Sequence, residues 1–401
     1  MSILTFSPVS VSMPLSSSAV VSPTFSTLVA PLESVLPTIT PLESRSNRPI
    51  TFTFEHQMKS LIYYHTEQYT SAQDLLQAMR EDASVRCIMV SESGLGESTF
   101  YEANATRGAA QMLEVLDRLS KRVSKRLGIA HPELGELVAI DASLIEATLS
   151  MSWADYSESQ RKVKAHVGFD LNRGIPRKLY LTEGKGAERP FVSLIIEPGQ
   201  TSVVDRGYQD HVRFDAWIEE GKHFVARIKK NTQWEILEEL PFLKGTNIFF
   251  FAKVLLGDDA HRMSHPVYLV GFRSRGKVYW VATDRTDLTP EQIAFIFSLR
   301  WEIEKLFAWW KKHLKVYHLI CRNPHGLLLQ LLAGLITYML LVLYFHQLYG
   351  EKPSIRRLRQ LRRQIRQETE SVRYLPIYIC LQIDIRQLIK LYLWLSLLAI
   401  F

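Results

Sequence analysis

The chain has 401 residues, of which 47% are hydrophobic and 22% charged, an ordinary globular balance with room for two or three domains. This composition excludes a wholly disordered chain, a collagen and a small disulfide scaffold. The formal net charge of +7 at pH 7 favours a polyanionic partner. The cysteines Cys87, Cys321 and Cys380 are scattered, so we expect no structural zinc site and a reducing compartment.

Residues 1–55 are predicted to form a flexible tail. The first 50 residues contain 24 Ser, Thr or Pro and only four charged side chains. Such a segment buries too little apolar surface to offset the conformational entropy lost on ordering. It is also a poor signal peptide, because no Lys or Arg precedes its first apolar stretch. A gene start assigned too far upstream is the alternative.

Residues 56–130 are predicted to be helical. Leu75, Leu76 and Met79 recur at helical spacing, and so do apolar residues between positions 112 and 119. Gly94 and Gly96 interrupt the pattern. Two helices joined by a glycine-containing turn are typical of a DNA-reading unit and equally of any helical hairpin.

Residues 131–232 alternate between predicted strands and helices. Two short apolar runs each end in an acid, which is Asp141 after residues 137–140 and Asp205 after residues 202–204. A continuous apolar run is typical of a strand buried on both faces, so both strands are expected to be central in a sheet. Ligands of α/β sheets gather at strand ends, and the two aspartates are therefore candidates for one site.

A β-rich insertion is expected over residues 233–285, with strands near 247–255, 266–272 and 278–283. Thr289 and Pro290 then begin a long helix over about 290–314, and the α/β core resumes over 286–350. The predicted fold is a mixed sheet flanked by helices, with an inserted β-rich subdomain and an N-terminal helical region.

The helix over 290–314 carries a charged stripe. At about 100° per residue, Glu304 and Lys311 lie about 40° and 20° from Arg300, with Phe297 about 60° away on the same side. Glu302 lies about 200° from Arg300, nearly opposite. Aromatic side chains border the stripe, which indicates that it is half-buried, and a half-buried carboxylate needs partners. Glu304 is therefore the third candidate acid.

Three carboxylates at one place repel one another unless a divalent cation binds. All-oxygen ligands, without Cys or His at metal-ligand spacing, favour Mg²⁺ or Mn²⁺ over zinc. Two such ions about 3.5–4 Å apart are a recurrent device for in-line phosphoryl displacement. The acids Asp141, Asp205 and Glu304 thus predict phosphoryl chemistry.

Three segments resemble the motifs of DDE-type insertion-sequence transposases. The run Phe297-x2-Arg300-x3-Glu304-x6-Lys311 resembles their Y-(2)-R-(3)-E-(6)-K signature, with Phe297 in place of the usual tyrosine. Residues 138–141 resemble the strand of the first aspartate, and residues 203–208 resemble the motif of the second. The likeness covers residues 130–345, with weaker support in the helical region before it.

The resemblance implies a ribonuclease-H-like core in which Asp141, Asp205 and Glu304 bind two Mg²⁺ ions, for which Mn²⁺ substitutes. It implies cleavage of DNA at the ends of an insertion sequence and transfer of the freed 3′-hydroxyl to target DNA, which related enzymes achieve through a hairpin. It also implies a homodimer bound to terminal inverted repeats, end binding by residues 56–130, and a cytoplasmic location at the nucleoid.

Five residues near the acids are candidate contacts with DNA: Arg300, Lys311, Lys164, Arg206 and Tyr208. The first two are expected to hold the phosphates of the cut strand. For the other three, a surface position, internal packing or a local ion pair is the alternative.

Three more residues are candidates for smaller roles. His166 is expected to be structural, and Trp280 is expected to pack in the β insertion, with stacking on a displaced base as the alternative. Asp284, another acid at a strand end, is the main rival of Glu304 as third ligand.

The longest apolar run, Leu327–Phe345, is long enough either to cross a bilayer or to form a buried helix. The buried helix is the preferred interpretation, because no second span of that quality is present, and no membrane partner is expected. Residues 351–401 are expected to be a basic helical region. Between 351 and 373 there are eight basic and three acidic residues, which predict either a solvated helix face or contacts with phosphates.

Three functions remain open at this point. The first is an active Mg²⁺-dependent transposase, and the second is a decayed or host-retained copy that binds DNA without catalysing transposition. The tail, Phe297 and the hydrophobic end at 391–401 fit the second, although all three acids are present. The third is a membrane protein anchored through residues 327–345, which a steep loss of DNA affinity with added salt would contradict.

Overall fold

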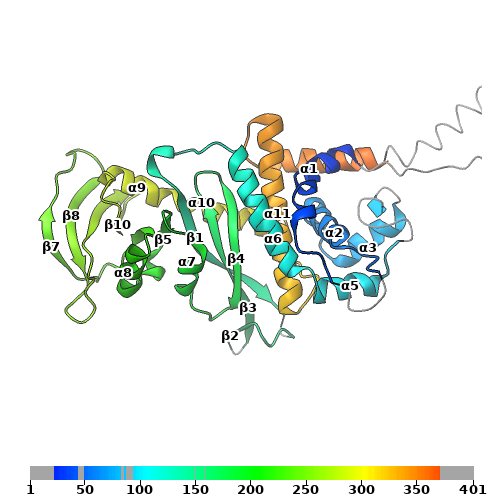
Figure 1. The fold of residues 1–401 in the computed structure, drawn as a ribbon, viewed down its shortest axis with the longest axis horizontal. Helices are drawn as coiled ribbons and strands as arrows, with labels where there is room; N and C mark the ends of the chain where they lie inside the picture. Colours follow the sequence, from blue (N-terminus) through cyan, green and yellow to red (C-terminus); the bar gives the residue numbers. More distant parts are fainter. Residues whose placement is uncertain are drawn as a thin grey trace, which may run out of the picture.

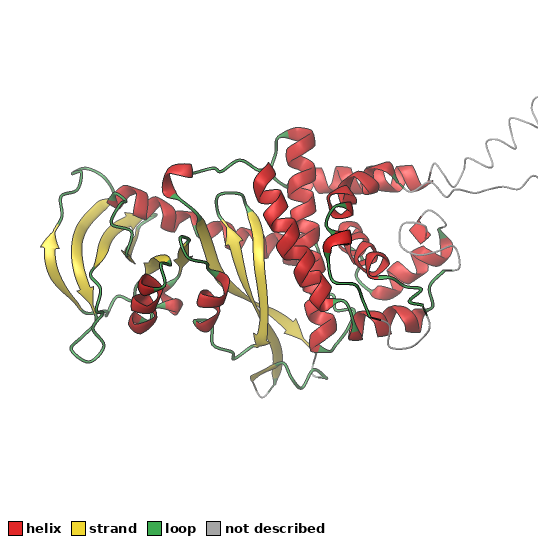
Figure 2. Ribbon diagram, in the orientation of Figure 1, coloured by secondary structure: helices red, strands yellow, loops and turns green. Residues whose placement is uncertain are grey.

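The computed structural model describes residues 22–43, 49–82, 85–86, 94–148, 150–157 and 159–370. A β-sheet with its covering helices occupies one side of the molecule, and a bundle of helices occupies the other (Figures 1 and 2). The long helix α11 (Pro324–Tyr349) lies between the two parts (Figure 1).

The described strands form one mixed sheet. In chain order they are β1 (Leu137–Ala147), β2 (Asp155–Ser157), β3 (Gln160–Asp170), β4 (Ile175–Glu183), β5 (Thr201–Val204), β6 (His223–Arg227), β7 (Trp234–Glu239), β8 (Ile248–Leu256), β9 (Val267–Ser274) and β10 (Lys277–Thr283). Their order across the sheet is β2-β3-β1-β5-β6-β10-β9-β8-β7, with β4 also paired to β3. The β1–β5 and β5–β6 pairs are parallel, and the others are antiparallel. The strands that precede the two aspartates are therefore neighbours at the centre of the sheet.

The described α-helices complete the architecture. In chain order they are α1 (Pro23–Glu33), α2 (Phe54–Glu67), α3 (Ala72–Glu81), α5 (Glu97–Thr106), α6 (Ala109–Arg126), α7 (Pro190–Ile195), α8 (His211–Glu219), α9 (Pro290–Leu299), α10 (Trp301–His313) and α11. A further helix covers residues 355–370 and is called the C-terminal helix below. Short 3₁₀ helices cover Leu36–Thr38, Pro132–Leu134 and Arg206–Tyr208.

The central strands are covered on both faces, because alternate side chains of a strand point to opposite sides. Val138, Val204 and Phe224 pack in a cluster with side chains of α7 and α8. Ala139 and Val203 belong to the other cluster, which contains the buried side chains of α9 and α10. The odd-numbered side chains of β1 and β5 therefore face α9 and α10.

The strands expected between residues 233 and 285 are present as β7 to β10. They were predicted to form an inserted subdomain, but they belong to the central sheet. β10 pairs antiparallel with β6, from Val281 opposite Arg227 to Thr283 opposite Val225. The strands β7 to β10 therefore extend the central sheet. Unpaired backbone groups at the edge of β6 would otherwise be open to other chains, and the insertion covers them.

Helix α11 is apolar and buried. Within the described residues it is the one helix long and apolar enough to cross a membrane, yet 89% of its most apolar stretch is buried in the protein. It contacts α1, α2, α5, α6, α10 and β4. A helix that is hydrophobic all round needs cover on every side, so this burial supports the predicted buried helix.

The prediction of a flexible tail over residues 1–55 is wrong for its described part. Helix α1 begins after Ser22, whose Oγ accepts a hydrogen bond from the Phe25 N–H at 3.1 Å. Phe25, Leu28 and Leu32 are each 1% exposed. They follow helical spacing on the face that meets α11, a pattern hidden by the average composition of the segment. Residues 1–21 and 44–48 lie outside the described residues, as does the hydrophobic end at 391–401.

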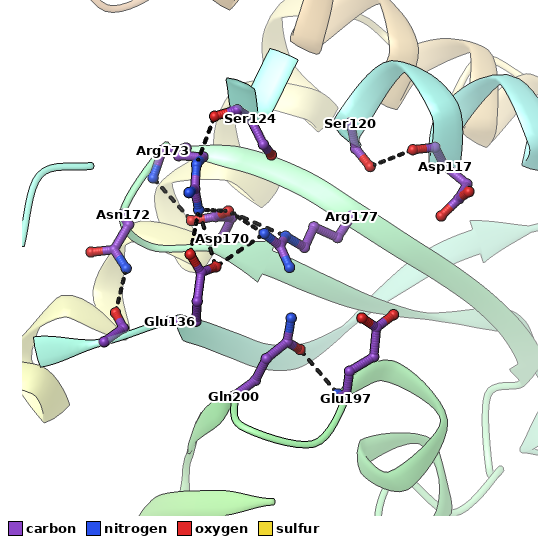
Figure 3. A network of polar contacts seen from close by, with 11 residues as sticks. Asp117, Ser120, Ser124, Glu136, Asp170, Asn172, Arg173, Arg177, Glu197 and Gln200 are labelled. Atoms are coloured by element: carbon purple, nitrogen blue, oxygen red, sulfur yellow. Dashed lines mark hydrogen bonds and ion pairs between the residues drawn. The ribbon is translucent and has the colours of Figure 1, made fainter. Parts of the chain in front are cut away.

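A network of ion pairs fixes the β3–β4 turn against α6 (Figure 3). Asp170 is 1% exposed, and its Oδ2 lies 3.1 Å from Arg173 Nη1 and 2.9 Å from Arg177 Nη2. Glu136 pairs with the same two arginines. Arg173 Nε also donates to the carbonyl of Ser124 near the end of α6, at 3.1 Å. Removing one arginine would leave the buried Asp170 carboxylate with a single cationic partner.

The carboxyl end of α2 covers the carboxyl end of α10. The last carbonyl groups of a helix have no partner within it. Two side chains at the end of α2 lie against such groups: His65 Nδ1 lies 2.7 Å from the oxygen of Leu314, the C-cap of α10, and Gln68 Nε2 donates to the His313 carbonyl at 2.7 Å. Tyr64 Oη donates to the carbonyl of His318, in the segment after α10, at 3.2 Å. The N-terminal helices are thus joined directly to α10.

Gly334 provides the first prediction, because α10 packs against α11 there. An added Cβ would lie 2.5 Å from Trp310 Nε1 and 2.6 Å from a methyl group of Val316. We predict that Gly334→Ala lowers the free energy of unfolding by about 1–3 kcal/mol through overpacking, despite the better helix propensity of alanine. Urea denaturation measures this change.

Gly128→Ala is the control, because nothing lies within 4 Å of a Cβ at that position. Its free energy of unfolding should stay within about 0.5 kcal/mol of the wild type. A Gly334→Ala protein more stable than the wild type would contradict the close α10–α11 packing.

His65 provides the second prediction. Burial lowers its pKa from 6.5 to about 4, so the folded protein holds the neutral ring. The unfolded chain takes up a proton at higher pH than the folded one, so stability is lost as pH falls from 6.5 to about 4. This side chain should account for about 3 kcal/mol of that loss. His65→Gln should remove this part of the pH dependence in urea denaturation at a series of pH values, and identical slopes in both proteins would refute the assignment.

Candidate active site

The strand register places Asp141 and Asp205 side by side. β1 and β5 pair in parallel with Ala139 opposite Val203, and two residues further along each strand come Asp141 and Asp205. Neighbouring strands are about 4.8 Å apart. Asp205 follows the end of β5, but Asp141 is the fifth residue of the eleven in β1, because β3 pairs with β1 along its whole length. The strand-end prediction is therefore correct for Asp205 and wrong for Asp141.

Both aspartates face α9 and α10. They continue the odd-numbered series of Ala139 and Val203, which pack on that side of the sheet. Arg227 on β6 lies level with Asp205, and its Nη1 is 3.2 Å from Asp205 Oδ1.

Arg300 connects the first aspartate to the predicted third acid. The predicted long helix is divided here, since α9 ends at Leu299 and α10 begins at Trp301. Arg300 keeps right-handed backbone angles, φ −51° and ψ −30°, so the helical spacing to Glu304 is retained. Its Nη2 donates to Glu304 Oε1 at 2.7 Å, and its Nη1 lies 3.6 Å from Asp141 Oδ2.

Asp141 has the most perturbed carboxyl group in this region. Burial is the main cause that raises its pKa to about 6, with the negative charges of Glu304 and Glu188 adding to the rise. The Ala142 N–H, which donates to Asp141 Oδ1 at 2.9 Å, and the Arg300 charge lower the pKa only in part. The ionised carboxylate is therefore short of positive charge. Strongly perturbed groups of this kind concentrate at functional sites.

Lys311 lies two turns beyond Glu304 and reaches back to β1. Its Nζ donates to the carbonyl of Leu144 at 2.6 Å, three residues after Asp141. Burial is the main cause that lowers its pKa. Phe297 is 7% exposed and packs against the rings of Phe272 and Tyr279, so the ring at this position has a structural role.

A hollow of about 440 Å³ opens beside Arg300 and Arg227. Its lining is basic and aromatic: Arg227, Arg275, Lys277, Arg300 and Lys305 with Phe272, Tyr279, Phe297 and Trp301, together with Ser274, Ser298 and Glu302. Arg227 lies over the ring of Tyr279 at 5.1 Å, and Trp301 is 54% exposed. Cationic and aromatic groups together suit the phosphates and bases of nucleic acid.

The two rival acids lie elsewhere. Asp284 accepts hydrogen bonds from the Phe224 N–H at 2.9 Å and from His223 Nδ1 at 2.6 Å, at the start of β6. Asp205 pairs with Arg227 at the other end of this strand, about 13 Å away by strand rise. Glu302 pairs with Lys305 on another face of α10.

The structure changes the roles expected for Lys164 and Tyr208. Lys164 Nζ is 3.0 Å from Glu188 Oε1 and donates to the Gly186 carbonyl, so it has internal partners. Tyr208 is 2% exposed, and burial next to Asp141 raises its pKa, so its position contradicts a direct contact with DNA. Arg206 is exposed, as a phosphate contact requires.

Two expected structural residues are packed inside the protein. His166 stacks on Phe191 with ring centroids 4.0 Å apart, and Trp280 packs against Trp234 and Phe250. Both agree with the expected structural role.

Two relevant residues were missed in the sequence. Arg227 comes directly after three apolar residues, 224–226, just as the two aspartates follow apolar runs. This position in the sequence could have indicated that Arg227 belongs to the site. Glu188 influences both Asp141 and Tyr208 from the loop after β4, and its place in the sequence gave no indication of this.

The acids do not form a ready metal cage. Among the described residues, no three His, Cys, Asp or Glu side chains are grouped closely enough to hold an ion. The arginines occupy the space between and beside the acids: Arg300 bridges Asp141 and Glu304, and Arg227 holds Asp205.

Comparisons with known proteins agree with the motifs. The transposase DDE domain family matches residues 132–340. A Synechocystis protein assigned as the transposase of insertion sequence element IS4SA is 29% identical over 252 residues, 61% of this chain and 71% of its own. The y4zB transposase of Sinorhizobium fredii is 28% identical over 256 residues, 61% of this chain and 70% of its own.

Structural similarity adds little. A cryo-EM structure of the piggyBac transposase synaptic complex with hairpin DNA has a TM-score of 0.42 at 10% identity, over 87% of this chain and 77% of that one. This likeness is too weak to carry an argument. The family match spans more than half of the chain and contains Asp141, Asp205 and Glu304. The chain therefore belongs to the transposase DDE domain family and is a DDE-type insertion-sequence transposase, as its motifs predicted.

Proposed function

We propose that this transposase cuts DNA at the ends of its insertion sequence with Asp141, Asp205 and Glu304 as the metal-binding acids, and joins the freed 3′-hydroxyl to target DNA. One observation supports this assignment above all. The two aspartates are level on neighbouring parallel strands and face α10, where Arg300 links Asp141 to Glu304.

The donor set fits Mg²⁺, with Mn²⁺ as a substitute. All three proposed ligands are carboxylates, the donors that hard divalent cations prefer. The raised pKa of Asp141 marks a carboxylate that lacks positive charge. Two bound ions would activate the attacking oxygen and stabilise the leaving oxygen.

The arginines have a double role in this proposal. Arg300 and Arg227 neutralise the acids in the metal-free protein. With cations bound to the acids, the guanidinium groups would be free to bind phosphates in the basic hollow that they line, a role that suits the fork geometry of arginine. Lys311 and Arg206 are the further proposed phosphate contacts, whereas Lys164 orders the loop of Glu188.

Several finer properties belong to the same proposal. The order β4-β3-β1-β5-β6, three antiparallel strands followed by two parallel ones, supports a ribonuclease-H-like core. A homodimer on inverted repeats, end binding by residues 56–130 and a place at the nucleoid follow from the family resemblance. The family match and the complete set of acids do not favour a decayed copy.

Cleavage of a duplex that carries the element's own end tests the assignment. Asp141→Ala, Asp205→Ala and Glu304→Ala should each cut about 10³-fold more slowly with Mg²⁺, because a lost ligand removes several kcal/mol of transition-state stabilisation. Each should still bind the duplex, since binding depends mainly on basic residues.

Asp284→Asn is the matched control, because this acid lies at the other end of β6. It should cut within a few-fold of the wild-type rate. Full activity in Glu304→Ala, or a thousandfold loss in Asp284→Asn, would show that the third ligand is misassigned. A wild-type protein that binds but never cuts would favour the decayed copy.

A further inference from the structure

The C-terminal helix presents one apolar and one basic face. Leu358, Leu361 and Ile365 are buried against the protein. At about 100° per residue, Arg359 and Arg363 lie within about 40° of each other and nearly opposite that apolar face. Both arginines are exposed.

Three other arginines of this helix have partners within the protein. Arg362 donates to Gln68 Oε1 at 2.9 Å and to the Glu67 carbonyl at 2.6 Å. Arg366 pairs with the buried carboxylate of Glu67 at 2.6 Å. Arg357 pairs with Glu351 at 2.9 Å. The contacts of Arg362 and Arg366 hold the helix on α2. Among the described residues, no acid forms an ion pair with Arg356, Arg359 or Arg363, and all three are exposed.

The end of α10 adds more positive charge at the same place. Gln68, which accepts from Arg362, also donates to the His313 carbonyl, so α10 and the C-terminal helix meet through one side chain. Burial and the positive charges of Lys312, Lys315 and Arg359 lower the pKa of His313. Nothing acidic in the described chain pairs with Lys312 or Lys315.

Lys315 also has an unusual backbone. Its φ is +54°, in the left-handed region that favours glycine or asparagine. A lysine there costs stability relative to asparagine. Its ammonium group lies over the ring of Tyr317, 5.7 Å from the centroid, and has no acidic partner among the described residues. The backbone angle of Lys315 is an observation separate from the lack of acidic partners described above.

We propose that Lys312, His313, Lys315, Arg359 and Arg363 form a basic surface that binds the phosphate backbone of duplex DNA outside the catalytic centre. The inference deepens the proposed function and depends on DNA being the substrate. Lys312 lies eight residues after Glu304 on one helix, about 12 Å along its axis, which equals three to four base pairs of DNA. The surface therefore sets the path of the DNA that leaves the active site.

The test compares three proteins on a random-sequence duplex of about 30 base pairs, with binding measured across a salt series. Arg359→Gln/Arg363→Gln should bind about 10- to 100-fold more weakly at 0.1 M salt, and its slope of log K against log[salt] should fall by about 2. Lys230→Gln/Lys244→Gln removes the same charge from exposed positions in the loops before and after β7 and should match the wild type. Equal losses in both variants would show a net-charge effect and overturn the proposal.

A second variant separates binding from folding. Lys315→Asn removes a charge at a position whose backbone suits asparagine, so it should bind DNA more weakly while its free energy of unfolding is unchanged or higher. Unchanged affinity would overturn the assignment of Lys315 to the surface.

Two further measurements complete the design. Cleavage of an end duplex by the wild type tests the proposed function separately, so a wild type that never cuts contradicts the proposed function and leaves the binding result intact. Vesicles of phosphatidylserine and phosphatidylcholine test the other polyanion. Loss of vesicle binding with unchanged DNA binding would overturn the proposal in favour of a lipid surface.

Discussion

The structure depends on the burial of α11. A helix of 26 residues without a polar face is stable only if other elements cover it on every side. Strand β4, the helices α6 and α10, and the N-terminal helices all contribute to that cover. Because these elements come from distant parts of the sequence, one hydrophobic requirement brings together the N-terminal helices and the centre of the chain. The close contact of Gly334 with Trp310 shows how tightly α10 is packed against α11.

The acids and arginines of the site form a balanced set of charges. Arg300 and Arg227 compensate the carboxylates in the absence of metal, but Asp141 remains under-compensated because it is the most buried of the three. Such an arrangement would keep the carboxylates separated and available for the divalent ions proposed above. The cost is a local loss of stability, which is common where a site is arranged for binding.

Much of the site could be predicted from sequence, because it depends on local periodicity. The spacing of Arg300 and Glu304 survives the division between α9 and α10, since Arg300 keeps helical angles. The mid-strand place of Asp141 could not be predicted, because it depends on the length of β3 pairing with β1. Pairing between β10 and β6 is equally non-local. Helix α1 was missed for another reason. A composition averaged over fifty residues conceals an amphipathic helix of eleven residues.

The contact between α2 and the end of α10 has a consequence for the boundaries of the functional unit. The family match ends at residue 340 and begins at residue 132, so it omits α2 and the last part of α11. A chain trimmed to that match would lack the partners of the final carbonyl groups of α10 and the cover of α11. The segment that defines the family by sequence is therefore smaller than the segment that folds. In this transposase, the N-terminal helices and the DDE domain are packed into one structure, and the edges of the family match cut through that packing.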